Sequence, residues 1–323
     1  MNKNTDNPLV SIVCVTYNHA AYIRDALDGF LMQKTNFSYE ICLGEDESID
    51  ETKDICREYQ KKNPGKIRLF ERSRENVIFV DNKATGRFNF IETLKESRGK
   101  YIAICDGDDY WTDPYKLQKQ IDFLEENEKY DMVHTNYKTL QDKIIKDNPD
   151  KASTVKDVKS QLLIKNFIST LTVCVKKSVL FEALPIINNQ YQAGDLALWM
   201  QISQKSKIGH LKDKTGVYRI SNNTRSNFKT TDDQLLFLRS GFKIKFDFID
   251  KYKYDQETID KVNHRWCRIL FKFYIKLEDS DIKFELNNFI HKRKQKNLWI
   301  YKFILFISHI GLIRKILKKL WRD

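Results

Sequence analysis

The stretch "YIAICDGDDYW" (residues 101–111) joins an apolar run to three carboxylates within four positions. The run is typical of a strand that is buried on both faces of a sheet. Asp106, Asp108 and Asp109 follow it directly, and three carboxylates that point the same way repel one another. Two interpretations are open: a strand-ending turn, because Asp and Gly are common in turns, or a site for Mg²⁺ or Mn²⁺ that a substrate diphosphate completes.

The chain on either side of this stretch alternates between strand and helix patterns. Apolar runs predict strands, and apolar residues at helical spacing predict the helices between them. The strands are expected at 9–17, 39–44, 66–70, 101–105 and 131–136, and the helices near 23–31, 55–59, 90–94 and 117–124. Such alternation indicates an α/β fold with a mainly parallel sheet and helices on both faces.

Polar clusters follow the first, second and fourth of these strands. They read "TYN" (16–18), "GEDES" (44–48) and "DGDD" (106–109). Ligands of parallel α/β sheets bind beyond the carboxyl ends of the strands, so the three clusters are expected to converge on one site. A turn accounts for one Asp but not for three at such a site, which favours the metal interpretation.

The second half of the chain is less regular. Residues 137–165 are polar and rich in lysine, which predicts a surface connection. Strands are expected at 169–177 and 215–221, and a helix at 194–203. From about residue 229 the pattern is helical to the end.

Composition restricts the class of protein. The chain has 323 residues, of which 41% are hydrophobic and 31% charged, which fits a globular body with a core. Six cysteines occur without the close spacing of a zinc or redox motif, and four lie in apolar runs, which favours the cytoplasm. We also expect no signal peptide, because the first residues lack a basic and then apolar leader.

The sequence after the first strand does not resemble a common phosphate-binding loop. The first strand ends in Thr16-Tyr17-Asn18, and neither GxGxxG nor GxxxxGKS occurs anywhere in the chain. This disfavours dinucleotide-binding enzymes and P-loop NTPases.

Three segments together, "PLVSIVCVTYN" (8–18), "GEDESIDET" (44–52) and "RGKYIAICDGDDYWTDPYKLQKQ" (98–120), resemble family 2 glycosyltransferases of the GT-A fold. The resemblance covers about residues 8–225. It implies transfer of a sugar, with inversion, from a nucleotide-diphosphate donor, usually a UDP-sugar. It also implies a GT-A catalytic domain over 1–228, with a nucleotide-binding half at 8–136 and an acceptor half at 166–228.

The resemblance assigns several roles to the first half. Thr16, Tyr17 and Asn18 would line the nucleoside pocket, and Asp46 would accept a hydrogen bond from the base. Glu45, which stands where the family more often has Asp, would also belong to the nucleotide-sugar site, and Glu47 stands where the family more often has Gly. The family's DxD corresponds to Asp106 and Asp108. Asp108 would bind Mn²⁺ or Mg²⁺ directly, and Asp106 would reach the ribose or a water on the metal.

The same resemblance suggests residues for the reaction itself. Asp195, at the start of the expected helix 194–203, would be the general base, although acidic residues also favour helix starts on electrostatic grounds. Arg87, with Lys83 as the second choice, would face the leaving diphosphate, or be a solvated surface arginine. Trp111 and Trp199 would flank a sugar or belong to the core. Arg219 and Arg225 would face the diphosphate.

The last quarter of the chain carries most of the net charge of +12. Residues 251–323 hold 18 Lys or Arg against 8 Asp or Glu. Within residues 297–322 apolar side chains share one helical face between basic clusters, which is typical of a helix on an anionic membrane surface. A helix packed on the protein with a solvated basic face is the alternative, and nucleic acid is disfavoured because no recognised binding module accompanies the charge.

The resemblance implies an enzyme of surface-polysaccharide biosynthesis, and the basic last quarter predicts that it is peripheral on the inner face of the plasma membrane. The expected partners are a nucleotide-sugar donor, a glycan or lipid-linked acceptor and an anionic membrane. Two other classes stay open: a sugar-nucleotide nucleotidyltransferase, which should have a Gly-rich loop after the first strand, and a non-catalytic membrane-associated protein, which would lack the charged site. The helical basic region is expected to span residues 229–323.

Overall fold

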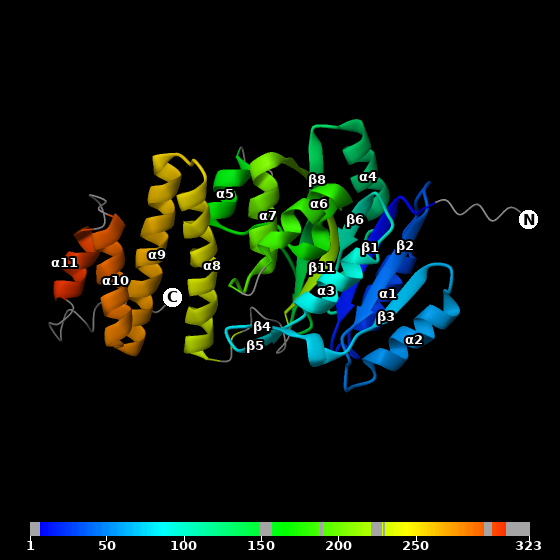
Figure 1. Ribbon diagram of the computed structural model, residues 1–323, viewed down its shortest axis with the longest axis horizontal. Helices are drawn as coiled ribbons and strands as arrows, with labels where there is room; N and C mark the ends of the chain where they lie inside the picture. Colours follow the sequence, from blue (N-terminus) through cyan, green and yellow to red (C-terminus); the bar gives the residue numbers. More distant parts are fainter. Residues whose placement is uncertain are drawn as a thin grey trace, which may run out of the picture. The chain divides into compact units, whose positions relative to one another are not determined.

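A computed structural model describes residues 7–148, 157–187, 190–220, 228, 230–293 and 299–307 (Figure 1). The chain divides into two compact units, Met1–Gly241 and Phe242–Asp323. The division falls within helix α8 (Thr231–Lys251). The first unit holds the sheet, and the second is helical.

One mixed sheet organises the first unit, and its strands follow the order β3-β2-β1-β6-β10-β8-β11-β7. Strands β3, β2, β1 and β6 are parallel, β10 is antiparallel to both of its neighbours, and β8 and β11 are again parallel. The bounds are β1 Val10–Thr16, β2 Tyr39–Glu45, β3 Ile67–Glu71, β6 Tyr101–Ile104, β7 Tyr110–Trp111, β8 Tyr130–Gln141, β10 Cys174–Lys176 and β11 Lys207–Ile220. The α/β class is confirmed.

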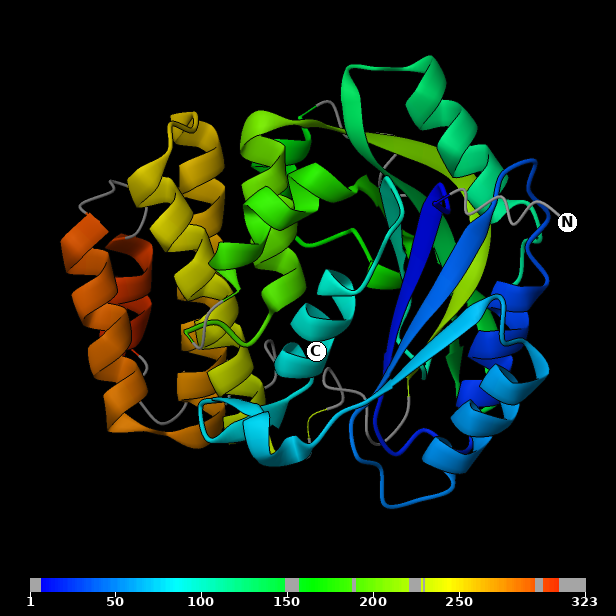
Figure 2. The same cartoon turned by 45° about the vertical axis from the view of Figure 1, so that its right-hand side comes forward.

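Helices cover both faces of the parallel half of this sheet. Helices α1 (Ile23–Leu31) and α2 (Thr52–Lys62) lie on one face, and α3 (Arg87–Lys95) lies on the other (Figure 2). Strands β1 and β6 are almost completely buried, because both of their faces are covered. This burial explains why their sequences read as continuous apolar runs.

The region after β6 differs from the sequence expectation in three places. Residues 137–165 are not only a connection, since β8 continues to Gln141 and pairs with β9 (Ile144–Asp147), and α5 spans Val158–Ile164. The strand expected at 169–177 is limited to β10, because Thr170–Thr172 form a 3-10 turn before it. Strand β11 is longer than 215–221, because it follows β8 along most of its length.

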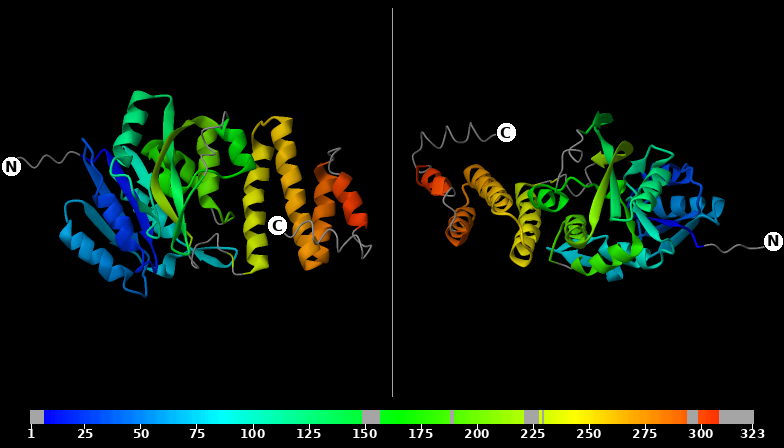
Figure 3. Two further views of the ribbon diagram at one scale, coloured as in Figure 1. Left: turned by 180° about the vertical axis from the view of Figure 1, so that it is seen from behind. Right: turned by 90° about the horizontal axis from the view of Figure 1, so that it is seen from above.

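The remaining helices of the first unit are α4 (Lys116–Glu126), α6 (Lys177–Ala183) and α7 (Gly194–Lys205). A small hairpin of β4 (Ile78–Val80) and β5 (Lys83–Thr85) precedes α3. The second unit contains α9 (Gln256–Leu277), α10 (Ser280–Arg293) and α11 (Trp299–Ile307), which follow one another as neighbouring helices (Figure 3).

The expected membrane-surface helix at 297–322 is described only in part. Residues 299–307 form α11, whereas 294–298 and 308–323 lie outside the described residues. In the described part of the chain, no helix is both long and apolar enough to span a bilayer.

Candidate active site

The acidic turn of residues 106–109 packs directly against the end of β1. The Gly107 amide donates to the Val15 carbonyl at 3.0 Å, and the Asp46 amide donates to the Thr16 carbonyl at 3.0 Å. A Cβ at Gly107 would lie 2.7 Å from Thr16 Oγ1, so a larger residue would not fit there without movement. The structure therefore brings together the three polar clusters that follow β1, β2 and β6.

The carboxylates of the acidic turn lie in unequal environments. Burial, followed by the charges of Asp108 and Asp195, raises the pKa of Asp106 to about 7. Burial and then the Asp108 charge raise the pKa of Asp109, although its Oδ1 accepts the Arg219 amide at 2.8 Å. The turn thus concentrates negative charge that these protein groups do not fully compensate.

This charge distribution fits a divalent cation whose coordination a substrate completes. Among the described residues, no three His, Cys, Asp or Glu side chains are close enough to form a metal cage by themselves. Mg²⁺ and Mn²⁺ at nucleotide sites are held by one or two carboxylates together with phosphate oxygens, so a complete cage is not needed. Asp108 and Asp106 are the carboxylates that would serve.

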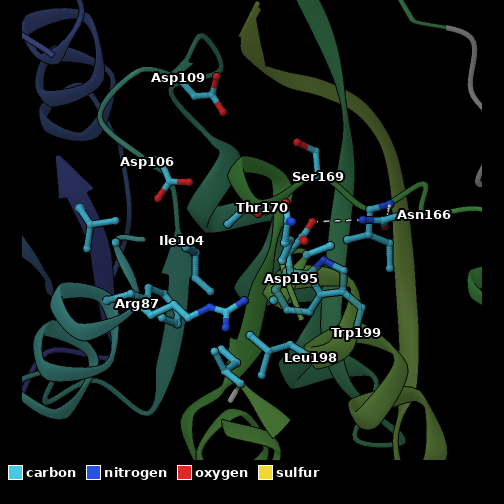
Figure 4. A pocket seen from close by; sticks show the side chains of 18 of the residues that line it. Arg87, Ile104, Asp106, Asp109, Asn166, Ser169, Thr170, Asp195, Leu198 and Trp199 are labelled. Carbon is cyan, nitrogen blue, oxygen red and sulfur yellow. Dashed lines mark hydrogen bonds between the residues drawn. The ribbon is translucent and has the colours of Figure 1, made fainter. Parts of the chain in front are cut away.

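A cavity of about 510 Å³ opens beside the acidic turn (Figure 4). Asp106 and Asp109 line it from the turn, Arg87 from the start of α3, and Asp195 from the start of α7. Its other walls are largely apolar and include Phe90, Ile104, Phe167, Ile168, Ile187, Leu198, Trp199 and Phe237. The cavity therefore places several charged groups in a low-dielectric surrounding, where electrostatic interactions are strong.

Asp195 lies in the first turn of α7, where the helix dipole favours a carboxylate. Its Oδ2 accepts a hydrogen bond of 3.1 Å from Asn166 Nδ2, which is drawn in Figure 4. Asp195 is also close enough to Asp106 to raise the pKa of that residue. A carboxylate that an amide orients, opposite an acidic turn, is suited to accept a proton inside the cavity.

Arg87 is not a solvated surface residue, because only 7% of it is exposed. Its Nη2 donates to the carbonyl of Tyr191, four residues before Asp195. Lys83, the second choice, forms an ion pair of 2.5 Å with Asp233 and does not line the cavity. Of the two candidates, the structure brings Arg87 to the site.

The residues expected at the nucleoside lie outside this cavity, at the ends of β1 and β2. Arg74 lies over the Tyr17 ring, 3.8 Å from its centroid, and its Nη1 is 2.6 Å from Asp46 Oδ2. Burial raises the pKa of Asp46, and the Arg74 charge opposes this rise. The sequence did not predict Arg74 as a residue of this region, although Arg74 follows β3, which ends at the same edge of the sheet.

Two other residues of this group are engaged in local structure. The fully buried Glu45 carboxylate accepts the amides of Glu47 at 3.1 Å and of Ser48 at 2.7 Å, and so closes the turn after β2. Asn18 has a φ of 53°, and its Oδ1 accepts the Ile49 amide at 3.0 Å. Both residues therefore shape the loops that follow β1 and β2.

The two tryptophans have different positions. Trp111 is 2% exposed, lies edge-on to Phe30 with ring centroids 4.8 Å apart, and donates its indole N–H to the Leu171 carbonyl at 2.9 Å. It does not line the described cavity, whereas Trp199 does. The structure therefore places Trp111 in the hydrophobic core.

The fold and the site define a class of enzyme. A mixed sheet with helices on both faces of its parallel half and an acidic turn at a strand end is the GT-A arrangement of glycosyltransferases. Residues 11–178 match the model of glycosyl transferase family 2. This match covers more than half of the chain, and the chain belongs to that family.

Comparison with relatives agrees with this assignment. An uncharacterized protein of Mycobacterium tuberculosis is 32% identical over 212 residues, which cover 65% of this chain and 58% of that protein. The match therefore spans little more than half of the length of this relative. The putative teichuronic acid biosynthesis glycosyltransferase TuaG of Bacillus subtilis is 26% identical over 230 residues, covering 69% of this chain and 83% of TuaG.

Solved structures support the fold. The structure of Staphylococcus aureus TarS with UDP-GlcNAc aligns with a TM-score of 0.64 at 18% identity, over 87% of this chain and 80% of that chain. The mannosyltransferase PcManGT of Pyrobaculum calidifontis, in complex with GDP-Man and Mn²⁺, aligns with a TM-score of 0.58 at 15% identity, over 99% of this chain and 89% of that chain.

Proposed function

We propose that the protein transfers a sugar from a nucleotide-diphosphate donor, a UDP-sugar, to a hydroxyl group of a glycan or lipid-linked glycan, with inversion, during surface polysaccharide biosynthesis. The observation that carries the proposal is that Asp195 shares one cavity with Asp106 and Asp109. In this arrangement Asp195 would act as the base on one side of the cavity, and the acidic turn would hold a cation on the other. The similarity to TuaG, a putative teichuronic acid biosynthesis glycosyltransferase, supports the assignment to surface glycans.

The residues of the chain divide the chemistry between them. Asp195, oriented by Asn166, takes the proton from the acceptor hydroxyl as that oxygen attacks the anomeric carbon. The bond from that carbon to the diphosphate breaks on the opposite side, which inverts the configuration. Arg87 contributes positive charge near the breaking bond, and it also holds the backbone before α7 through the Tyr191 carbonyl.

Asp108, together with Asp106, would hold a divalent cation. When bound there, Mn²⁺ or Mg²⁺ supplies positive charge that stabilises a leaving diphosphate. Tyr17 would stack on the base, and Asp46 would accept its N–H once Arg74 moves or shares this contact. TarS with UDP-GlcNAc and PcManGT with GDP-Man and Mn²⁺ share the fold, which supports a nucleotide-sugar donor and a divalent cation here.

The experiment that tests this function is a donor screen. The purified protein is incubated with Mn²⁺ and a panel of UDP- and GDP-sugars, and release of the nucleoside diphosphate is measured with and without glycan acceptors. We expect release with a UDP-sugar that increases when an acceptor is present. Pyrophosphate release from a nucleoside triphosphate and a sugar phosphate would instead indicate a nucleotidyltransferase, although the loop after β1 is not rich in glycine.

We propose further that the helical unit attaches the enzyme to the anionic inner face of the plasma membrane. Three apolar side chains of α11 are exposed, Ile300 at 45%, Phe303 at 53% and Phe306 at 76%. The residues from 251 onward carry ten more positive than negative charges. Exposed aromatic side chains beside basic charge suit the interface of an anionic bilayer, where the lipid-linked acceptor would be found.

A further inference from the structure

Arg219, near the end of β11, connects the acidic turn to helix α1. Its Nε donates to the Asp108 carbonyl at 2.9 Å, and its Nη2 donates to Asp25 Oδ2 at 2.8 Å. Its own backbone amide donates to Asp109 Oδ1 at 2.8 Å. One residue therefore holds two consecutive positions of the turn, and it is separated from them by about 110 positions in the chain.

The guanidinium group is also confined by aromatic rings. Its central carbon lies 4.7 Å from the centroid of the Tyr22 ring and 5.1 Å from that of Tyr110. Only 13% of the Arg219 side chain is exposed. A planar guanidinium group that donates in two directions between two rings has a fixed orientation, which a lysine cannot reproduce.

These contacts use the backbone of Asp108 and leave its carboxylate available. Among the described residues, the Asp108 side chain has no hydrogen-bond or ion-pair partner, and it remains half-buried at the turn. The neighbouring Asp109 carboxylate is engaged by the Arg219 amide instead. Arg219 thus holds the backbone of the acidic turn in place without contacting the Asp108 carboxylate, which is the group that would bind a cation.

We propose that Arg219 is a positioning residue for the metal and diphosphate site: it fixes the Asp108 carboxylate through the backbone of the acidic turn and does not itself bind the diphosphate. This inference rests on the proposed function, because it takes Asp108 as the metal ligand. It departs from the sequence expectation that Arg219 faces the diphosphate. Arg225, the second arginine of that expectation, lies outside the described residues.

The test measures binding of Mn²⁺ alone to the full chain by electron paramagnetic resonance. Residues that orient metal ligands typically change metal affinity 10- to 100-fold when they are replaced, so Arg219→Met should weaken Mn²⁺ binding by about tenfold or more. Arg219→Lys should give an intermediate affinity. Arg24→Met is the matched control. Arg24 lies on α1, is 49% exposed and pairs with Glu58 of α2, so this substitution should leave Mn²⁺ affinity unchanged.

Binding of UDP without metal is measured on the same variants and should stay near that of the wild type. Wild-type Mn²⁺ affinity in Arg219→Met would overturn the inference, and a loss of UDP binding in the same variant would show that Arg219 contacts the diphosphate instead. If Arg219→Met does not fold, Arg219→Lys decides, and wild-type Mn²⁺ affinity in that variant also overturns it. A wild-type protein that binds no Mn²⁺ would overturn both this inference and the proposed metal site.

Discussion

Asn166 Nδ2 donates a hydrogen bond of 3.1 Å to Asp195 Oδ2. The two residues are 29 positions apart, and both line the cavity beside the acidic turn. The bond occupies one carboxylate oxygen with an amide, which fixes the orientation of the other oxygen in the cavity. A general base needs such a fixed position, because proton transfer requires hydrogen-bond distance to the hydroxyl group that reacts.

Asp195→Asn is expected to lower the turnover number by about 10²-fold or more, the scale of a lost general base. The KM for the donor should change little, because the amide has nearly the shape of the carboxylate. Steady-state kinetics with a saturating acceptor measure both quantities. Asp122→Asn, an exposed aspartate on α4, is the control and should behave as the wild type. A variant with normal turnover and weaker donor binding would mean that Asp195 positions substrate only.

Asp108→Asn should preserve the fold and remove the activity that depends on a bound metal ion. A cation at a leaving diphosphate is worth several kcal/mol, so activity should fall by at least about 100-fold. Chelation of the wild-type protein with EDTA should have the same effect, and added Mn²⁺ or Mg²⁺ should reverse it. Thermal unfolding of the variant without metal is the control for folding. Full activity of the wild-type enzyme in EDTA would contradict the metal site.

The double substitution Phe303→Ser and Phe306→Ser should weaken binding to vesicles of anionic phospholipid by tenfold or more. Each fully buried Phe contributes about 1.5–3 kcal/mol, and partial insertion at an interface contributes a fraction of this. The effect is measured as the fraction of protein that floats with anionic vesicles, compared with the fraction that floats with neutral vesicles. Phe79→Ser is the matched control, because Phe79 is 58% exposed but lies on β4 in the other unit. Equal flotation of both variants would show that α11 does not enter the interface.

Stability of the helical unit should depend on pH through Lys245. Burial, together with the charge of Arg265, lowers the pKa of this lysine from 10.5 to about 7. Between about pH 7 and 10.5 the unfolded chain therefore binds this proton and the folded protein does not. The free energy of unfolding should rise with pH across this range, by at most about 1.4 kcal/mol per pH unit.

The variant Lys245→Met should remove this rise and increase the free energy of unfolding at pH 7. Urea denaturation at pH 7 and pH 9 measures both effects. Lys243→Met is the control, because Lys243 lies on the same helix but is 49% exposed and pairs with Asp247. The dependence on pH should persist in this control, and its loss there would assign the effect to another group.

The sequence alone predicted the parts of the fold that local patterns specify. Strands β1 and β6 are continuous apolar runs because helices cover both faces of this half of the sheet. The carboxyl ends of neighbouring parallel strands lie at one edge of the sheet. The positions of the TYN, GED and DGDD clusters after these strands were therefore enough to predict that the clusters lie close together. The family assignment from the same motifs is confirmed by the match over residues 11–178.

Only the tertiary structure decided which side chains reach the site. Arg87 meets the Tyr191 carbonyl 104 positions away, and Arg219 meets Asp25 194 positions away. Trp111 and Trp199 look alike in sequence, but the Leu171 carbonyl fixes the first in the core while the second lines the cavity. Such contacts depend on distances between segments that are remote along the chain. Residue type and spacing determine what a side chain can do, whereas the packing of remote segments determines what it meets.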